Sequence, residues 1–363
     1  MSLWVDKYRP KKLDQLSYHN GLTENLKALA STGDFPHLLV YGPPGSGKKT
    51  RIYGTLYELY GPQVEKLKID VNTFTTTSNR KLEFNVLSSA HHLEITPSDM
   101  GNNDRVVIQD LLKDVASVEQ VDFSNSTKSK SKHRFKVVII NEADSLSKDA
   151  QAALRRTMEK YSANIRLILV SNTTSGIIAP IKSRTLLVRV PAPSETDIAD
   201  ILSGISKKEG LKFKPDTDNA KQELFRNIAL HAERNLRRTL LCFETLSMQS
   251  DTINIDKNTL SLVSIDWEVI ISNLAKSIAA NKSVANIAKS RVVLYELLSH
   301  CIPARTILKR LLFDLIGLNN YNDKITQELT EYAALFDERL SLGQKSIFHL
   351  EGFVARAMLI LDK

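Results

Sequence analysis

The sequence predicts an α/β domain built on a parallel sheet, followed by two all-helical domains. Three observations support this fold class. Between residues 36 and 190, short apolar runs alternate with stretches of helical periodicity, a pattern typical of buried parallel strands and their covering helices. The glycine-rich segment 42–50 joins the first run to the first of these helices. Beyond residue 194, apolar residues recur at helical spacing.

The strand-like runs of the first domain are each long enough to cross a sheet once. They cover residues 37–41, 67–71, 137–140, 165–170 and 186–190. Residues 72–95 are rich in Thr, Ser and Asn and then alternate between apolar and polar positions, which predicts an inserted hairpin or edge strand. We expect this insertion to elaborate the sheet and not to form its core.

A change of pattern at the Pro-Ala-Pro segment 191–193 marks the end of the first domain. Ser194 and Asp197 form a capping box ahead of an apolar run, which predicts the start of a helix. Residues 194–256 fit a small bundle of helices and show no strand pattern. The sequence therefore predicts domains at residues 1–192, 193–258 and 259–363.

The third domain is predicted to be all helix because its apolar residues repeat at spacings of three and four. One such row consists of Trp267, Ile270, Ile271, Leu274 and Ile278. The final segment, 347–361, is apolar on more than one side. Such a helix belongs either in a core or in an interface with another subunit.

Composition indicates a soluble, globular protein. The chain has 363 residues, 42% of them hydrophobic, and no run of about 18 apolar residues that would cross a membrane. Its N-terminus lacks the apolar stretch of a signal peptide. Cys242 and Cys301 lie in apolar helical patterns, so we expect buried thiols and a reducing compartment. A net charge of +8 is compatible with a polyanionic partner.

Segment 42–50 reads Gly-Pro-Pro-Gly-Ser-Gly-Lys-Lys-Thr and follows the phosphate-binding loop pattern as far as its first lysine. The backbone N–H groups around Gly45, Ser46 and Gly47 are expected to close on a polyphosphate, with Lys48 reaching the outer phosphates. The alternative is a Gly-Pro turn that arose by chance. The strand-like run before the loop and the helical pattern after it favour a site for ATP or ADP.

The loop departs from the pattern at one position. A Ser or Thr hydroxyl that binds Mg²⁺ normally follows the lysine, but this chain has Lys49 there. The hydroxyl of Thr50 lies one residue further on, a turn of roughly 100° on a helix, so it does not simply take over the role. We still expect both side chains to border the nucleotide.

A second departure follows the apolar run 136–140. In working ATPases with this loop, that strand ends in an Asp that holds Mg²⁺ and an acid that activates water. Here Asn141 takes the metal position and Glu142 keeps the second. Together with Lys49, Asn141 makes the site more positive by two charges, because a hydroxyl became a cation and an anion became neutral. We expect Mg²⁺ to bind weakly or not at all, and hydrolysis to be lost.

One alternative keeps the metal. Thr50, Asp144 or water molecules would then complete its coordination, and the site would turn over slowly. Two further polar positions lie near sheet edges: Asn172 follows the run 165–170, and Arg184 precedes the run 186–190. An Arg on a loop is either a solvated surface residue or a group that stabilises charge on a neighbouring subunit's nucleotide.

These motifs together resemble the AAA+ clamp-loader family, and closely the small subunits of replication factor C, over essentially the whole chain. Segment 4–10, Trp-Val-Asp-Lys-Tyr-Arg-Pro, looks like the family's N-terminal box. The resemblance implies that an adenine pocket is lined by Val5, Tyr8, Arg9 and Pro10. It also implies the roles of sensor 1, arginine finger acting in trans and sensor 2 for Asn172, Arg184 and Arg237.

The variants Gly-Lys-Lys-Thr and Asn-Glu-Ala-Asp, with segment 93–105, resemble the subunit at the end of the five-subunit arc, subunit 5 in budding-yeast naming. In that family this position carries a degenerate ATPase. The resemblance implies a RecA-like AAA+ P-loop domain, a small helical lid and an all-α collar for oligomerisation. It further implies a nuclear hetero-pentamer with other replication factor C subunits, the PCNA sliding clamp as partner, and primer-template DNA.

Two helices are candidates for contact with DNA. The apolar face of the helix predicted at 148–161 leaves Lys148, Arg155 and Arg156 largely elsewhere, and Arg105 begins the helix at 104–115. Helices of this domain follow the duplex backbone in the family, so phosphate contacts without base reading are expected. The alternative is a solvated helix face with ion pairs along the helix.

These inferences predict a clamp-loader subunit that binds nucleotide with little or no hydrolysis, helps open and load PCNA, and lends Arg184 to a neighbour's ATP. Two other functions stay open. A self-sufficient DNA-dependent AAA+ ATPase motor would need an intact metal site. A pure scaffold would leave the pocket empty.

Overall fold

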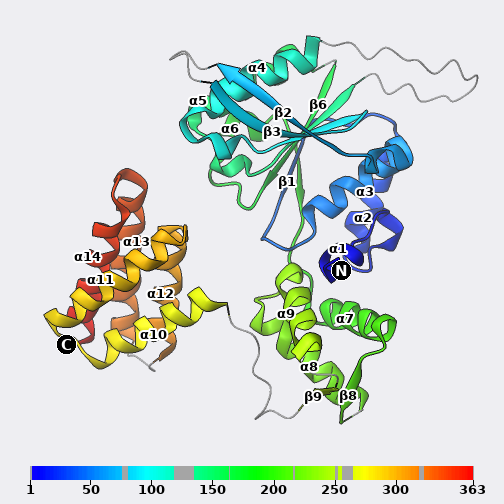
Figure 1. Cartoon of the computed structure of the whole chain (residues 1–363). Coiled ribbons are helices and arrows are strands. Elements are labelled where there is room, and N and C mark those ends of the chain that lie inside the picture. Colours follow the sequence, from blue (N-terminus) through cyan, green and yellow to red (C-terminus); the bar gives the residue numbers. More distant parts are fainter. Residues whose placement is uncertain are drawn as a thin grey trace, which may run out of the picture. The chain divides into compact units, whose positions relative to one another are not determined.

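The structure, a computed structural model, describes residues 2–75, 81–117, 135–162, 164–215, 217–249, 252–255, 265–318 and 323–362. It divides into two compact units, Met1–Leu262 and Val263–Lys363 (Figure 1). The first unit contains the sheet, the glycine-rich loop and the first helical bundle, and the second contains only helices among its described residues.

The larger sheet has seven strands in the order β2-β3-β4-β5-β6-β1-β7. Its parallel part consists of β4 (His92–Ile95), β5 (Lys136–Ile140), β6 (Ile165–Ser171), β1 (Leu38–Tyr41) and β7 (Leu186–Arg189). Because these strands run in the same direction, their carboxyl ends meet at one edge. The parallel sheet predicted from the apolar runs is confirmed, and the complete sheet is mixed.

The antiparallel part of the sheet is the hairpin of β2 (Lys68–Thr75) and β3 (Lys81–Ser88), with β3 also antiparallel to β4. The prediction that the run 67–71 forms a strand of the parallel core is therefore wrong, since it belongs to an edge strand. Apolar and charged residues alternate in this run, which is typical of a strand with one polar face and not of a strand buried on both faces. Ile69 is 71% and Val71 57% exposed. The strand that lies beside β5 in the parallel part of the sheet is β4 and not β2.

Alternate residues of the central strands pack into different layers. Leu38 and Val40 of β1 join a core with Ile52 of α3, whereas Leu39 between them joins the core beneath α4 and α5. The first layer contains α2 (Asn20–Ser31) and α3 (Lys48–Tyr60), and the second contains α4 (Asp104–Ser117) and α5 (Lys148–Lys160). The sheet thus lies between two helical layers (Figure 1).

Shorter helical segments connect these elements. They are α1 (Trp4–Lys7), η1 (Leu13–Gln15), η2 (Gly61–Glu65), η3 (Pro97–Asn103), η4 (Ala143–Ser145) and α6 (Ala179–Lys182). Segment η3 leads directly into α4, and η4 follows the end of β5.

The helical bundle after the sheet consists of α7 (Glu195–Glu209), α8 (Asp218–His231) and α9 (Leu236–Gln249). The predicted capping box begins α7: the N–H of Asp197 donates to the hydroxyl of Ser194, and the Ser194 N–H donates to the Asp197 carboxylate, both at 3.0 Å. The strands β8 (Lys212–Lys214) and β9 (Thr252–Asn254) pair in parallel. The sequence pattern missed this small sheet because its strands are only three residues long.

The second unit packs five helices around one apolar core, within residues 265–318 and 323–362. They are α10 (Asp266–Ala280), α11 (Val284–Ser299), α12 (Ala304–Leu318), α13 (Asp323–Leu342) and α14 (Ser346–Leu361). The row that begins at Trp267 lies on the core side of α10, as predicted. None of the helices in the described ranges is both long and apolar enough to cross a bilayer.

The two cysteines differ in environment. Cys242 of α9 is buried, as expected. Cys301 is exposed, so the prediction of a buried thiol there is wrong. It follows the end of α11 with φ of 60°, and a residue in this left-handed turn leaves the helix and its apolar face.

Candidate nucleotide site

The glycine-rich loop connects the end of β1 to the first turn of α3, at the edge where the parallel strands end. Gly45 and Gly47 have φ of 72° and 85°, which L side chains rarely adopt. A Cβ at Gly45 would lie 1.8 Å from the side-chain oxygen of Asn235, and one at Gly47 would lie 2.4 Å from the Tyr18 hydroxyl. The loop therefore needs glycine for backbone conformation and for close packing.

Lys48 begins α3 and folds over the loop. Its ammonium donates to the carbonyl oxygens of Gly42 at 2.7 Å and Pro43 at 2.9 Å, and to the Oδ1 of Asn172 at 3.1 Å. The structure thus brings together Lys48 and Asn172, which are 124 residues apart in the sequence. Burial lowers the pKa of Lys48 to about 8; the charge of Asp144 acts against this, and that of Arg237 adds to it.

Lys49, in the first turn of α3, pairs with a carboxylate on a strand of the sheet. Its Nζ lies 2.6 Å from the Oε1 of Glu94 on β4, whose side chain is 11% exposed. The same carboxylate accepts hydrogen bonds from the Tyr53 hydroxyl and from the amide nitrogen of Asn141, the latter at 2.7 Å. Burial acts to raise the pKa of Glu94, but the hydrogen bonds from Lys49, Tyr53 and Asn141 outweigh it and lower the pKa. We call these four residues the Glu94 cluster.

The Glu94 cluster lies where the metal-binding side chains of a working site are expected. Asn141 follows β5 and is 6% exposed, and its amide nitrogen also donates to the Thr96 hydroxyl at 3.2 Å. The ammonium of Lys49 has no lone pair to offer a metal, and the Glu94 oxygens already accept from several donors. These residues do not fit a Mg²⁺ ion, which needs oxygen ligands in octahedral geometry.

The acidic residues after β5 point to different partners. Glu142 is exposed, has φ of 50° and accepts a hydrogen bond from the Ser98 hydroxyl at 3.0 Å. Asp144 accepts from the backbone N–H of Asn172 at 3.1 Å and of Thr173 at 3.3 Å. Asp144 therefore holds the start of the loop after β6, close to the Lys48 ammonium.

The remaining loop residues surround the start of α3. Ser46 is 1% exposed, and its carbonyl oxygen accepts from the Tyr18 hydroxyl at 3.2 Å. Thr50 lies in the first turn of α3 and is half-buried. Among the described residues, no group of three or more His, Cys, Asp or Glu side chains is arranged to hold a metal.

The N-terminal box lies against the helical bundle that follows the sheet. Trp4 packs edge-on against Phe243 of α9, and Val5 and Tyr8 pack against the same core. The Tyr8 hydroxyl donates to the Glu209 carboxylate at the end of α7. This contact places the box residues beside the bundle.

Arg9 and Pro10 follow Tyr8 in the N-terminal box. The Arg9 guanidinium is 5.7 Å from the centre of the Tyr53 ring, and Tyr53 belongs to the Glu94 cluster. Pro10 is half-buried. The N-terminal box thus extends from the helical bundle to α3.

Arg237 and Asn235 come from the start of α9. Arg237 is exposed and close enough to Lys48 to influence its pKa. Asn235 touches the loop at Gly45 and accepts from the N–H of Arg238 at 3.3 Å. The sequence singled out Arg237 but missed Asn235. An Asn just before a helix is a signal for a cap and says nothing about the loop it contacts.

Arg184 follows α6 and lies away from the loop. Its guanidinium pairs with Glu159 of α5 at 2.5 Å and donates to the Pro180 carbonyl at 3.0 Å. Glu159 also pairs with Arg155 at 3.3 Å. Arg184 is exposed, so it is accessible to a partner molecule.

The N-termini of α4 and α5 are joined by a buried acid. Asp104 is 2% exposed and accepts from the N–H of Ser147 at 2.7 Å and from its hydroxyl at 2.9 Å. This contact brings the exposed Arg105 and Lys148 to neighbouring helix ends. Arg156 is also exposed, on α5. The predicted apolar face of α5 is confirmed, and it includes the buried amide of Gln151.

Comparison with known proteins gives the family. Three family models match: "Replication factor C subunit 3, C-terminal domain" over residues 267–363, "DNA polymerase III, delta subunit" over 19–194, and "RCF1/5-like, AAA+ ATPase lid domain" over 200–248. Replication factor C subunit 5 of Saccharomyces cerevisiae is 53% identical over all of both chains. The chain belongs to the replication factor C subunit family.

Other members of the replication factor C family match over the same length. Replication factor C subunit 3 of Homo sapiens is 47% identical over 100% of this chain and 97% of that protein. Among solved structures, a variant of RuvB from Thermotoga maritima has a TM-score of 0.52 at 16% identity, over 86% of this chain and 91% of RuvB. That similarity shows a shared fold. It agrees with an AAA+ domain followed by a helical lid and a helical C-terminal domain.

Besides Asn235, two more residues of the site escaped the sequence patterns. Glu94 lies in a stretch quoted for its resemblance, yet its role depends on β4 lying beside β5. Arg51 is 1% exposed beneath the loop. It shares a helix face with Thr55, four positions on, and a pair of polar residues at that spacing gives no sign of burial in the sequence.

Proposed function

We propose that this chain is a clamp-loader subunit whose pocket retains ATP or ADP with little or no hydrolysis. The Glu94 cluster supports this proposal above all, because an ion pair within the protein stands where a metal would be bound. The nucleotide is held by backbone N–H groups of the loop and by Lys48, with the N-terminal box and Arg237 around the base and phosphates. A nucleotide held in this way stabilises the fold.

Charge is the physical reason that binding and hydrolysis separate at this site. Phosphoryl transfer needs a metal to offset charge that develops on the transferred phosphate. Lys48 and the positive end of α3 stabilise the ground-state phosphates without one. Glu142 is exposed next to a site that does not seat the ion, so it has no activated water to deprotonate.

Within a complex, the chain would act through its surfaces. We propose a nuclear hetero-pentamer with other replication factor C subunits that opens the PCNA clamp and loads it onto primer-template DNA. Arg105, Lys148, Arg155 and Arg156 would contact DNA phosphates. Arg184 would leave Glu159 and stabilise charge on a neighbouring subunit's ATP. These side chains are exposed and lie on α4, on α5 and just after α6, which supports this assignment.

The test measures binding and turnover with the purified chain. ADP and ATP affinities are determined by titration with excess Mg²⁺ and again with EDTA, alongside the rate of phosphate release. We expect affinities that agree within about threefold in the two buffers, no release above background, and a large loss of affinity in Lys48→Ala. Robust Mg²⁺-dependent turnover that Glu142→Gln abolishes would instead support a self-sufficient DNA-dependent motor. Absence of binding, or binding indifferent to Lys48→Ala, would support a scaffold.

A further inference from the structure

Arg51 is a buried cation directly behind the phosphate-binding loop. It is the fourth residue of α3, is 1% exposed, and its guanidinium lies 4.4 Å from the centre of the Tyr18 ring. Its nitrogens donate to the Tyr18 carbonyl at 2.9 Å and to the Ser46 carbonyl at 3.4 Å. Its Nε has no hydrogen-bond partner. In the described part of the chain, no carboxylate pairs with this guanidinium.

A buried charge without a counter-ion is costly, and carbonyl oxygens offset only part of that cost. Two other sources of positive charge lie near Arg51. Lys48 and the positive end of α3 lie beside it. Glu94 is committed to Lys49. A group that brings negative charge to the loop would therefore be stabilised by Arg51 as well as by Lys48.

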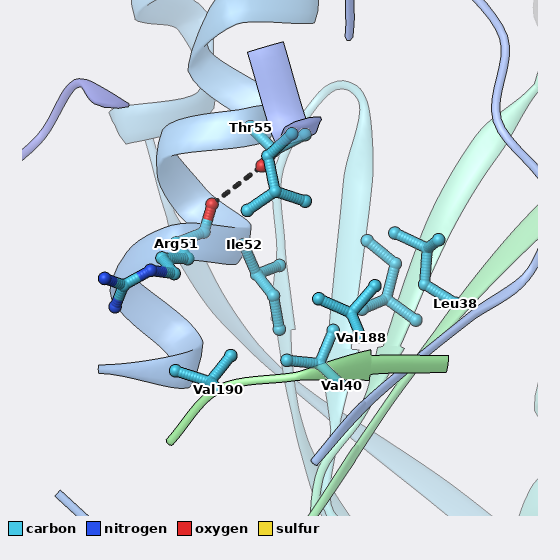
Figure 2. Close-up of a pocket in the computed structure, with 9 residues that line it drawn as sticks. Leu38, Val40, Arg51, Ile52, Thr55, Val188 and Val190 are labelled. Atoms are coloured by element: carbon cyan, nitrogen blue, oxygen red, sulfur yellow. Dashed lines mark hydrogen bonds between the residues drawn. The ribbon is translucent and has the colours of Figure 1, made fainter. Parts of the chain in front are cut away.

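The pocket beside Arg51 does not suit such a group. This pocket is small, and Figure 2 shows the guanidinium pointing away from the apolar side chains that line it. Those side chains include Leu38, Val40, Ile52 and Val188. An anion would find no polar partner among them. The position of a Cβ on Gly47 is 3.1 Å from an Arg51 nitrogen, so one layer of loop backbone separates the cation from the phosphate side.

We propose that Arg51 is a positioning residue that sets the affinity of the pocket for nucleotides by the number of their phosphates. This inference rests on the proposed nucleotide site and adds a second cation to it. Arg51 acts through the loop: it fixes the Ser46 carbonyl, so that the loop N–H groups point inward, and it supplies positive charge from behind. In nucleotide sites that hold a metal, the ion supplies positive charge to the phosphates. Here Arg51 would supply part of that charge.

The experiment compares ADP with AMP in the full chain without Mg²⁺. Arg51→Gln keeps donors for the two carbonyls but removes the charge, whereas Arg51→Lys keeps the charge. The readout is the ratio of the AMP Kd to the ADP Kd. A partly unfolded variant loses affinity for both ligands by the same factor, so this ratio is independent of folding. We expect the ratio to fall at least about fivefold in Arg51→Gln and to stay within about twofold in Arg51→Lys.

Arg166→Gln is the matched control. Like Arg51, Arg166 places its guanidinium against an aromatic ring, that of Phe135, but it pairs with the carboxylate of Asp34. The ratio of the AMP Kd to the ADP Kd in Arg166→Gln should equal that of the unmodified chain. An unchanged ratio in Arg51→Gln, or an equal fall in Arg51→Gln and Arg51→Lys, would overturn the proposal. If the unmodified chain did not bind ADP at all, the proposed nucleotide function itself would be contradicted.

Discussion

The Nζ of Lys49 lies 2.6 Å from the Oε1 of Glu94. Lys49 belongs to α3, the helix after the loop, and Glu94 to β4, which is three places from β1 in the sheet. The same carboxylate accepts a hydrogen bond from Asn141 at 2.7 Å. The two residues that depart from the metal-binding pattern are thus joined through one acid. In this polar cluster the charges of Lys49 and Glu94 offset each other.

Reversing both departures from the metal-binding pattern should make ATP affinity depend on Mg²⁺. In Lys49→Thr with Asn141→Asp, a hydroxyl and a carboxylate replace a cation and an amide, which returns two oxygen ligands to the site. We expect ATP affinity to become at least about tenfold higher with Mg²⁺ than with EDTA, which corresponds to about 1.4 kcal/mol. Isothermal titration in the two buffers measures this difference.

The matched control changes a lysine of similar environment outside the site. Lys11 pairs with Glu65 at 2.7 Å, so Lys11→Thr also breaks a lysine–glutamate pair. It should leave the metal dependence as it is in the unmodified chain. If the double variant also binds equally well in both buffers, the Glu94 cluster does not explain weak metal binding.

Nucleotide affinity should depend on pH through Lys48. The pKa of this ammonium is lowered to about 8, and a phosphate beside it would raise the pKa again. The chain with a protonated Lys48 therefore binds ADP better. ADP affinity is highest below pH 8 and falls as the pH rises above 8, by up to tenfold per pH unit. Titrations of ADP at pH 7, 8, 9 and 9.5 measure the slope, and Lys48→Met should remove it.

Arg184 should be needed by the complex and not by the isolated chain. Arg184→Ala removes the guanidinium proposed to reach a neighbour's ATP, and a loss of about a thousandfold is expected at the one site it serves. The total ATPase rate of the reconstituted complex should fall by that site's share. Arg184→Lys should not restore it, because an ammonium lacks the planar fork.

Arg189 is a suitable comparison for Arg184, since it is exposed on the adjacent strand β7. Arg189→Ala should leave the rate of the complex near its original value. An unchanged rate in Arg184→Ala would show that the pairing with Glu159 is the residue's main role.

Asp104 should contribute strongly to stability. Its buried carboxylate accepts from Ser147 and from the N–H of Arg105, and it joins the ends of α4 and α5. Asp104→Ala leaves these donors without an acceptor, and we expect a loss of about 3 kcal/mol in the free energy of unfolding. Urea denaturation followed by circular dichroism measures it. Asp110→Ala, at an exposed position of the same helix, should change it by less than about 0.5 kcal/mol.

Local patterns were sufficient for much of the fold. Runs such as 136–140 and 165–170 are continuous and apolar, and they became β5 and β6 because buried parallel strands need apolar residues on both faces. The alternating run 67–71 became an edge strand, and β4 entered the core with Glu94. Strand order was not predictable there, because it depends on which residues pair at long range.

The sequence by itself determined the loop, its lysines and the loss of the usual metal ligands, since each of these is a matter of residue type at a fixed spacing. Only the tertiary structure decided what replaced the metal. Glu94 meets Lys49 across 45 residues of chain, and Arg51 became a buried cation because the loop folds over it. Charges act through space, so their partners depend on the packing of distant segments and not on neighbours in the sequence.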